Sequence, residues 1–171
     1  MLDLGPTSPA NLHFITGLGH RAYNEDLLLA ASDPGLLIPA GEEENKRILN
    51  TSRFLSENLD YQTATFDAVL LWDLADYLPE ALVKPVIDRL HRAMKPKGIL
   101  FGFFHTRDAG PEAPYFRFNI ASAESIELRP GPAFRLQRIF NNRHVENLFH
   151  DYASVKFFLG RDNMREVLVI R

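Results

Sequence analysis

Phe66-Asp67-Ala68-Val69-Leu70-Leu71-Trp72 is the stretch that decides the fold. From Ala68 to Trp72 every residue is apolar, which is typical of a β-strand covered on both faces. A second apolar run, Ile99 to Phe104, follows a segment with helical spacing. Strands of this kind that alternate with helices predict a mostly parallel sheet with helices on both faces.

The beginning of the chain extends this alternation. Met1 to Leu4 predicts a short buried strand that ends at Gly5. Ser8 followed by Pro9 predicts a helix start, and the helix is expected to run to about Leu18. A short second strand is then expected over 21–24.

The middle and the end of the chain contribute further elements. Residues 31–45 predict a loop, and Asn45 to Leu59 predict a helix that runs into a strand near 53–56. Pro85 is expected as the first residue of a helix, because a proline inside a helix removes a hydrogen bond. Phe134–Phe140 is expected to be extended. Val155–Leu159 and Glu166–Ile170 predict a closing antiparallel hairpin.

Length and composition limit the classes of protein. The 171 residues suit a single domain, and 46% hydrophobic residues suffice for a core. The absence of cysteine excludes disulfides and thiolate metal sites. No segment reads as a signal peptide or a membrane span, so the default expectation is a cytoplasmic protein.

The charge distribution gives a weaker indication. The net charge of −3 carries no basic signature for nucleic acid. Residues 129–171 nevertheless hold eight basic and four acidic side chains. They either face an acidic partner or form an ordinary solvated surface.

Gly5 and Asp26 form the first candidate site. A glycine at the end of a first strand lets the backbone approach a ligand closely. A carboxylate at the tip of the second strand can accept both hydroxyl protons of a ribose. The spacing fits one strand, one helix and a return strand, so it indicates a nucleoside-containing cofactor. The alternative is a glycine-terminated strand in a fold without a ligand.

Four segments together resemble class I S-adenosylmethionine-dependent methyltransferases. Met1-Leu2-Asp3-Leu4-Gly5 resembles the opening motif of that family, and Asp26 falls where the family holds the ribose. Phe66-Asp67-Ala68-Val69 resembles its fourth strand. Leu90 to Gly98 resembles its helix-to-strand junction. The resemblance implies a three-layer α/β/α sandwich with a seven-stranded, mostly parallel Rossmann-like sheet and a C-terminal antiparallel hairpin.

The chain departs from the family at three places. Thr7 and Pro9 stand where the family loop usually has glycine. Asn58 or Glu57 stands roughly where the family often has an aspartate beside the adenine. The single domain, 1–171, also begins on the first strand, without the helix that usually precedes it in the family.

The resemblance implies a role for each candidate residue. The methionine part of S-adenosylmethionine is expected on Asp3, Gly5 and Pro6, the ribose on Asp26, and the adenine beside Asn58 and Leu59. Trp72, Asp73 and Tyr77 are expected to line the methyl-transfer rim, with contributions from 106–116 and 120–140. No metal site is expected.

Asp73 and His105 are the catalytic candidates, and Asp76 could, like Asp73, orient a substrate or carry a proton. His105 directly follows the run from Ile99 to Phe104 and could act as a general base with a pKa near neutrality. The competing interpretations are a core Trp72, an Asp73 that caps the next turn, and an ordinary loop histidine.

The predicted function is methyl transfer to a small molecule, with a protein side chain as the next acceptor. A non-catalytic binding or scaffold protein of the same fold is the main alternative, and Thr7 and Pro9 favour it. A nicotinamide-dependent oxidoreductase is less consistent with the sequence, because the loop lacks the glycine spacing for a pyrophosphate. The oligomeric state is not predicted.

Overall fold

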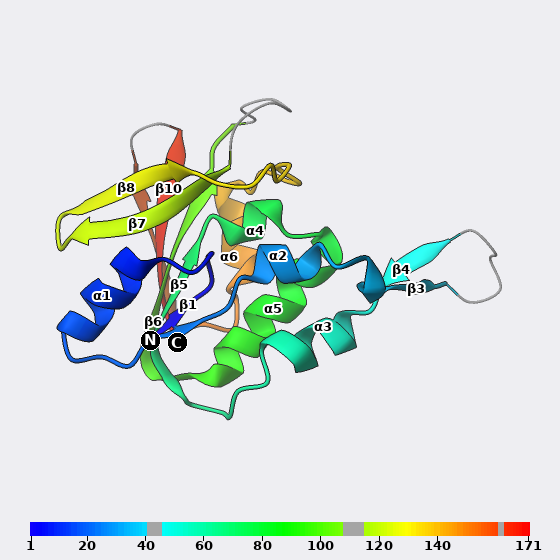
Figure 1. Ribbon diagram of the computed structural model, residues 1–171, viewed down its shortest axis with the longest axis horizontal. Coiled ribbons are helices and arrows are strands. Elements are labelled where there is room, and N and C mark those ends of the chain that lie inside the picture. The colour runs from blue at the N-terminus through cyan, green and yellow to red at the C-terminus, as the bar shows by residue number, and fades with distance from the viewer. Residues whose placement is uncertain (41–45, 108–114, 161–162) are drawn as a thin grey trace.

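A six-stranded sheet forms the centre of the molecule (Figure 1). The computed structural model describes residues 1–40, 46–107, 115–160 and 163–171. The strand order is β2-β1-β5-β6-β10-β9. These strands are β1 (Leu2–Asp3), β2 (Tyr23–Asn24), β5 (Phe66–Trp72), β6 (Met94–His105), β9 (Ser154–Leu159) and β10 (Met164–Ile170).

The first four strands of the sheet run in parallel. β1 pairs in parallel with both β2 and β5, and β5 pairs in parallel with β6. β10 then lies antiparallel between β6 and β9. The chain therefore proceeds from β1 to one side and returns to build the other side from β5. That reversal makes the junction of β1 and β5 the switch point of the sheet, and sheets of this type bind ligands at the carboxyl ends of the strands there.

Helices and two hairpins surround the sheet. The helices are α1 (Pro9–Gly17), α2 (Leu27–Ala31), α3 (Thr51–Asn58), α4 (Leu74–Tyr77), α5 (Glu80–Ala93) and α6 (Asn142–Leu148), with a short 3₁₀ turn η1 (Pro34–Leu36). The hairpins pair β3 (Leu37–Pro39) with β4 (Arg47–Leu49), and β7 (Phe116–Ser122) with β8 (Ser125–Pro130). Figure 1 shows α1 and the β7–β8 hairpin on one side of the sheet and α3, α5 and α6 on the other.

The two faces of the sheet are covered differently. Val69 and Leu100 point into a large core that includes Phe54 of α3, Leu90 of α5 and Val145 of α6. The opposite face carries a small aromatic cluster of Trp72, Phe103 and Phe118, with partly buried apolar residues around it. One face is therefore a packed helical layer, whereas the other is only partly covered.

The sheet has six strands in the described residues, one fewer than predicted. The predicted strand near 53–56 is part of α3. The Asn50 side chain accepts a hydrogen bond from the Arg53 amide at 3.0 Å and caps this helix, and Arg53 pairs with Glu57 one turn later at 2.8 Å. These local contacts favour a helix over an extended chain.

Other predictions also need correction. Pro85 lies inside α5 rather than at its start. The burial of Leu82, Val86 and Ile87 along the same helix outweighs the one hydrogen bond that the proline removes. Phe134–Phe140 forms no strand, although Phe140 is buried.

Several loops contain residues that the structure does not describe. Of the loop predicted over 31–45, residues 34–39 form η1 and β3, and 41–45 lie outside the described residues. The same holds for 108–114 and for 161–162 in the closing turn. In the described parts of the chain, every helix is too short or too polar to cross a bilayer.

Candidate functional site

The carboxyl ends of β1, β2 and β5 meet at one edge of the sheet. Asp3 is in register with Asn24 of β2 and with Leu70 of β5. Two residues farther along these strands stand Gly5, Asp26 and Trp72. The structure therefore brings the predicted glycine, the predicted ribose carboxylate and Trp72 of the predicted rim to one edge, at the switch point of the strand order.

Asp3 is a buried junction of this edge. Its side chain is 2% exposed, and both of its oxygens accept hydrogen bonds from the protein. Oδ1 accepts from Trp72 Nε1 at 2.6 Å and from the Gly5 amide at 3.1 Å, and Oδ2 accepts from Asn11 Nδ2 at 2.9 Å. These hydrogen bonds give Asp3 a structural role at this edge, and its contact with the cofactor stays a prediction.

Trp72 occupies the space beside Gly5. A Cβ atom on Gly5 would lie 3.0 Å from Trp72 Cδ1, so the glycine makes room for the indole ring. Trp72 has a φ of 52°, which is rare for a bulky residue and marks a strained turn at the end of β5. Its ring stacks on Phe118 with centroids 5.2 Å apart. This tryptophan both ends the strand and forms a wall of the site.

Asp26 begins α2 and remains partly exposed. Its Oδ1 accepts a hydrogen bond from the Leu29 amide at 3.1 Å, and Oδ2 has no protein partner among the described residues. Asn24 lies between Asp26 and Gly5 in this edge and donates to the Gly5 carbonyl at 2.8 Å. Thr7 donates to the Asn24 side chain. The loop after β1 is thus fastened to the end of β2.

Asp73, Asp76 and His105 form a buried cluster at the ends of β5 and β6. Asp73 is 2% exposed and Asp76 is fully buried. His105 connects them: its amide donates to Asp76 Oδ2 at 2.6 Å, and its Nε2 lies 3.4 Å from Asp73 Oδ2. Oδ1 of each carboxylate is buried without a hydrogen-bond partner among the described residues. The structure therefore brings the two predicted catalytic residues together and adds a second carboxylate.

Burial governs the protonation of this cluster. It raises the pKa of the Asp73 carboxyl, although the nearby His105 ring opposes the shift. Burial raises the pKa of Asp76 well above its ordinary value, and the charge of Asp73 adds to that effect. Burial also raises the pKa of Tyr77 and Tyr115, whose rings pack edge-to-face at 5.0 Å. The tyrosines stay neutral and form an apolar wall beside His105.

Asn58 and Leu59 stand at the end of α3, which contacts α2, the helix that Asp26 begins. The Asn58 side chain donates to the Phe54 carbonyl at 2.8 Å, and Leu59 is buried in the core. The predicted adenine contacts of these two residues stay a prediction.

Pro6 is half-buried in the loop after Gly5. Its contact with the cofactor stays a prediction. Sequence reasoning missed Asn24 and Asn11 as parts of the site, whereas it named Asp76, one helical turn after Asp73.

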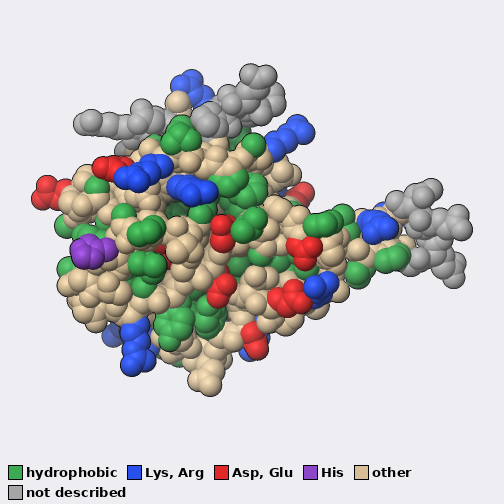
Figure 2. Space-filling model, in the orientation of Figure 1, with side chains coloured by type: hydrophobic (Ala, Val, Ile, Leu, Met, Phe, Trp, Pro, Cys, Tyr) green, Lys and Arg blue, Asp and Glu red, His purple; other side chains and the backbone are tan. Residues whose placement is uncertain are grey.

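Charges and metal ligands add little to this picture. Among the described residues, no group of three or more histidine and acidic side chains could hold a metal ion. Figure 2 shows basic side chains interspersed with acidic ones on the face in view.

Comparison with known proteins places the fold. No family model matches the chain, and no curated protein matches it. Among solved structures, a SAM-dependent methyltransferase from Methanosarcina mazei is 17% identical, with a TM-score of 0.53, and the match covers 99% of this chain and 91% of that chain.

A second similar structure comes from Burkholderia thailandensis. It is 1,6-didemethyltoxoflavin-N1-methyltransferase with bound 1,6-didemethyltoxoflavin and S-adenosylhomocysteine. The identity is 14% and the TM-score 0.54, and the match covers 99% of this chain and 69% of that one. Against a possible exported protein from Bordetella parapertussis, with a TM-score of 0.44, the chain spans 49% of that chain's length. The chain has the fold of class I SAM-dependent methyltransferases.

Proposed function

We propose that this chain is an S-adenosylmethionine-dependent methyltransferase that acts on a small-molecule acceptor. The observation that carries the proposal is the strand register, which puts Gly5 and Asp26 at the switch point of a methyltransferase-like sheet. The similar Burkholderia enzyme holds a demethylated cofactor and a small molecule together, which supports the same pair of ligands here.

The residues at this edge fit a nucleoside in part. Among the residues that the structure describes, Asp26 keeps one carboxylate oxygen without a hydrogen-bond partner after it caps α2, and this oxygen can accept from a ribose hydroxyl. Pro6 and the fastened loop after Gly5 form a rigid floor. When bound, the cofactor supplies a methyl group on a sulfonium centre. The protein then has to align the acceptor with that methyl group and exclude water.

His105 is the proposed general base. Its side chain is 18% exposed, whereas that of Asp73 is 3% exposed, so the imidazole can touch an acceptor and the carboxylate cannot. Asp73 is therefore a positioning residue that orients the ring through Nε2. Proton removal is needed only for an acceptor that must lose a proton, such as a hydroxyl or an ammonium group.

A cofactor titration tests the proposal. Isothermal calorimetry with S-adenosylmethionine and S-adenosylhomocysteine should show binding to the wild type. Asp26→Ala should weaken it on the order of tenfold to a hundredfold, because hydrogen bonds to a charged group contribute about 1.5–3 kcal/mol each. Asp33→Ala is the matched control, because Asp33 also caps a helical turn, η1, through its side chain.

The second candidate function is a non-catalytic protein of the same fold. It is favoured by the indole ring against Gly5 and by the hydrogen bond from Thr7 to Asn24, which together reduce the space for a cofactor at this edge of the sheet. The same titration separates the two functions. Absence of binding for both nucleosides would support the second, and equal affinities for wild type and Asp26→Ala would remove the ribose role of Asp26.

A further inference from the structure

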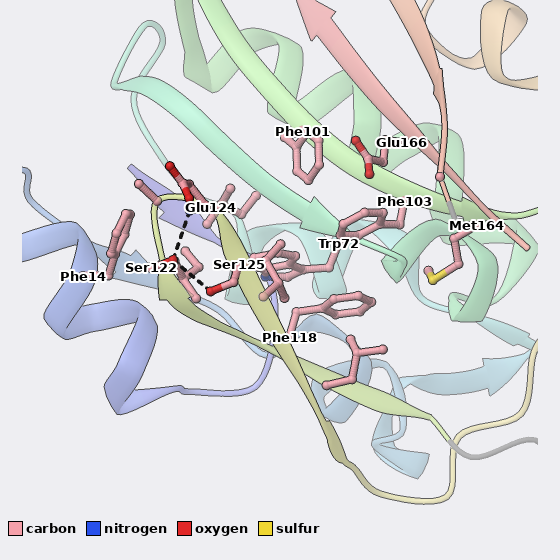
Figure 3. A pocket seen from close by; sticks show the side chains of 16 residues that line it. Phe14, Trp72, Phe101, Phe103, Phe118, Ser122, Glu124, Ser125, Met164 and Glu166 are labelled. Atoms are coloured by element: carbon pink, nitrogen blue, oxygen red, sulfur yellow. Dashed lines mark hydrogen bonds between the residues drawn. The ribbon is translucent and has the colours of Figure 1, made fainter. Parts of the chain in front are cut away.

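A large cavity lies on the partly covered face of the sheet (Figure 3). It has a volume of about 890 Å³ and lies between that face and the β7–β8 hairpin. This volume is in the range of sites for drug-sized ligands. The cavity is separate from the edge that holds Gly5 and Asp26, and Trp72 is the residue that borders both.

The walls of this cavity are mainly apolar, and five of the sixteen described lining residues are aromatic. Trp72 and Phe103 come from the sheet and Phe118 from the hairpin, and their rings are nearly parallel. The centroid of Phe118 lies 5.2 Å from that of Trp72 and 5.0 Å from that of Phe103. Phe101 and Leu70 extend the same apolar wall. Such surfaces favour an apolar or aromatic guest.

Two carboxylates are the charged groups of the cavity. Among the described lining residues, Glu124 and Glu166 carry charge, and neither lysine nor arginine is present. Figure 3 shows Glu124 at the tip of the hairpin and Glu166 on the sheet beside Phe101 and Phe103.

Glu166 is the more informative of the two. It is half-buried on β10, directly opposite Phe103 of β6 and Phe158 of β9. Its carboxylate has no hydrogen bond or ion pair within the described chain. A half-buried carboxylate without a partner is unfavourable on an apolar wall. A cation in the cavity would pair with it and would also be attracted by the aromatic faces.

We propose that this cavity binds an organic cation with an apolar or aromatic body, in which the body packs on the partly exposed Phe101 and Leu70 beside the stacked rings and the positive charge lies at Glu166. The proposal does not depend on the cofactor site, and its test uses protein without cofactor.

A charge-matched pair of probes tests it. Trp72 is the sole tryptophan of the chain, so its fluorescence reports binding in the cavity directly. Phenylbutylammonium and phenylbutyrate share one apolar body and differ in the sign of their charge. We expect the ammonium to bind at least about ten times more tightly, which corresponds to about 1.4 kcal/mol. Added salt should weaken the binding of the ammonium and reduce the difference in affinity between the two probes.

Two variants locate the charge. Glu166→Gln should abolish most of the preference for the ammonium. Glu127→Gln should retain it, because Glu127 is exposed on the same hairpin, pairs with Arg129 at 3.1 Å and does not line the cavity. Circular dichroism should show that both variants are folded.

The proposal is overturned by equal affinities for the two probes, by no binding of either probe, or by an undiminished preference for the ammonium in Glu166→Gln. Self-association that covers this face would appear in sedimentation as a dimer that neither probe enters, and it would overturn the proposal too. Each of these results leaves the cofactor titration unaffected, so the two proposals fail separately.

Discussion

The ends of β1 and β5 carry buried carboxylates in opposite circumstances. Asp3 at the end of β1 uses both oxygens to accept from Trp72, Gly5 and Asn11. Asp76, which follows β5, is equally buried but has one oxygen without a partner among the described residues. A buried aspartate therefore stabilises the end of β1, whereas the buried aspartate after β5 has an unpaired oxygen that is unfavourable for stability. Full hydrogen bonding marks a structural carboxylate, and an unpaired buried oxygen marks a functional candidate.

The largest effect is expected from Asp3→Ala. The substitution leaves the indole N–H, the Gly5 amide and the Asn11 amide group buried without their acceptor. Each such group costs about 1–3 kcal/mol, so the free energy of unfolding should fall by about 3 kcal/mol or more. Urea denaturation measures it. Asp67→Ala is the control, because Asp67 is exposed and pairs with Lys95 at the surface. A similar loss in both variants would contradict the special role of Asp3.

Asn11→Ala tests the same junction from its other side. The Asn11 side chain donates to the Phe118 carbonyl at 3.0 Å and accepts from the Ile120 amide at 2.7 Å. Its loss should destabilise the protein by about 2 kcal/mol, because three buried polar groups lose a partner. Hydrogen exchange should show the Ile120 amide exchanging faster than the amides of β5. Unchanged protection of Ile120 would show that the hairpin is held by its apolar contacts alone.

The third effect, which depends on pH, is expected at Asp76. Its pKa is raised in the folded protein, so ionisation favours the unfolded chain. The stability of the wild type is therefore complete in acid, below the ordinary pKa of an aspartate, and falls as the pH rises through the raised value. Asp76→Asn keeps the acceptor for the His105 amide and removes the ionisation.

The measurement for Asp76 is a comparison across pH. The free energy of unfolding of Asp76→Asn relative to the wild type should increase between about pH 4 and pH 7, by about 1.4 kcal/mol for each unit of pKa shift. Asp60→Asn, at an exposed position, should show no such trend. A flat difference for Asp76→Asn would mean that the buried carboxyl does not titrate differently in the folded state.

The sequence correctly predicted those strands and helices whose signals lie within the segment itself. Phe66–Trp72 is a strand because every side chain from Ala68 onward is apolar, and Ser8 with Pro9 starts α1 as expected. The segment 53–56 could not be assigned in this way. Its helix depends on the cap at Asn50 and on the ion pair between Arg53 and Glu57. The same residues also fit the pattern of a strand, so the sequence alone does not decide between helix and strand.

The candidate site was predictable only where chain order fixes it. Gly5 and Asp26 lie at the same edge because parallel strands end at one edge of a sheet, and this follows from the alternation of strands and helices in the sequence. The role of Asp3 did not follow, because its partner Trp72 is 69 positions away. The orphaned oxygen of Asp76 was equally hidden, since burial arises from packing rather than from neighbours in sequence.

The attachment of the β7–β8 hairpin has a consequence for how the protein folds. The bond from the Ile120 amide to Asn11 joins residues 109 positions apart. Closing so long a loop carries a large entropic cost before any contact offsets it. On the ribosome, α1 must therefore wait until about two thirds of the chain has been synthesised before its partner exists. The roof over the aromatic cavity is accordingly among the last parts of the molecule to assemble, and among the first expected to open.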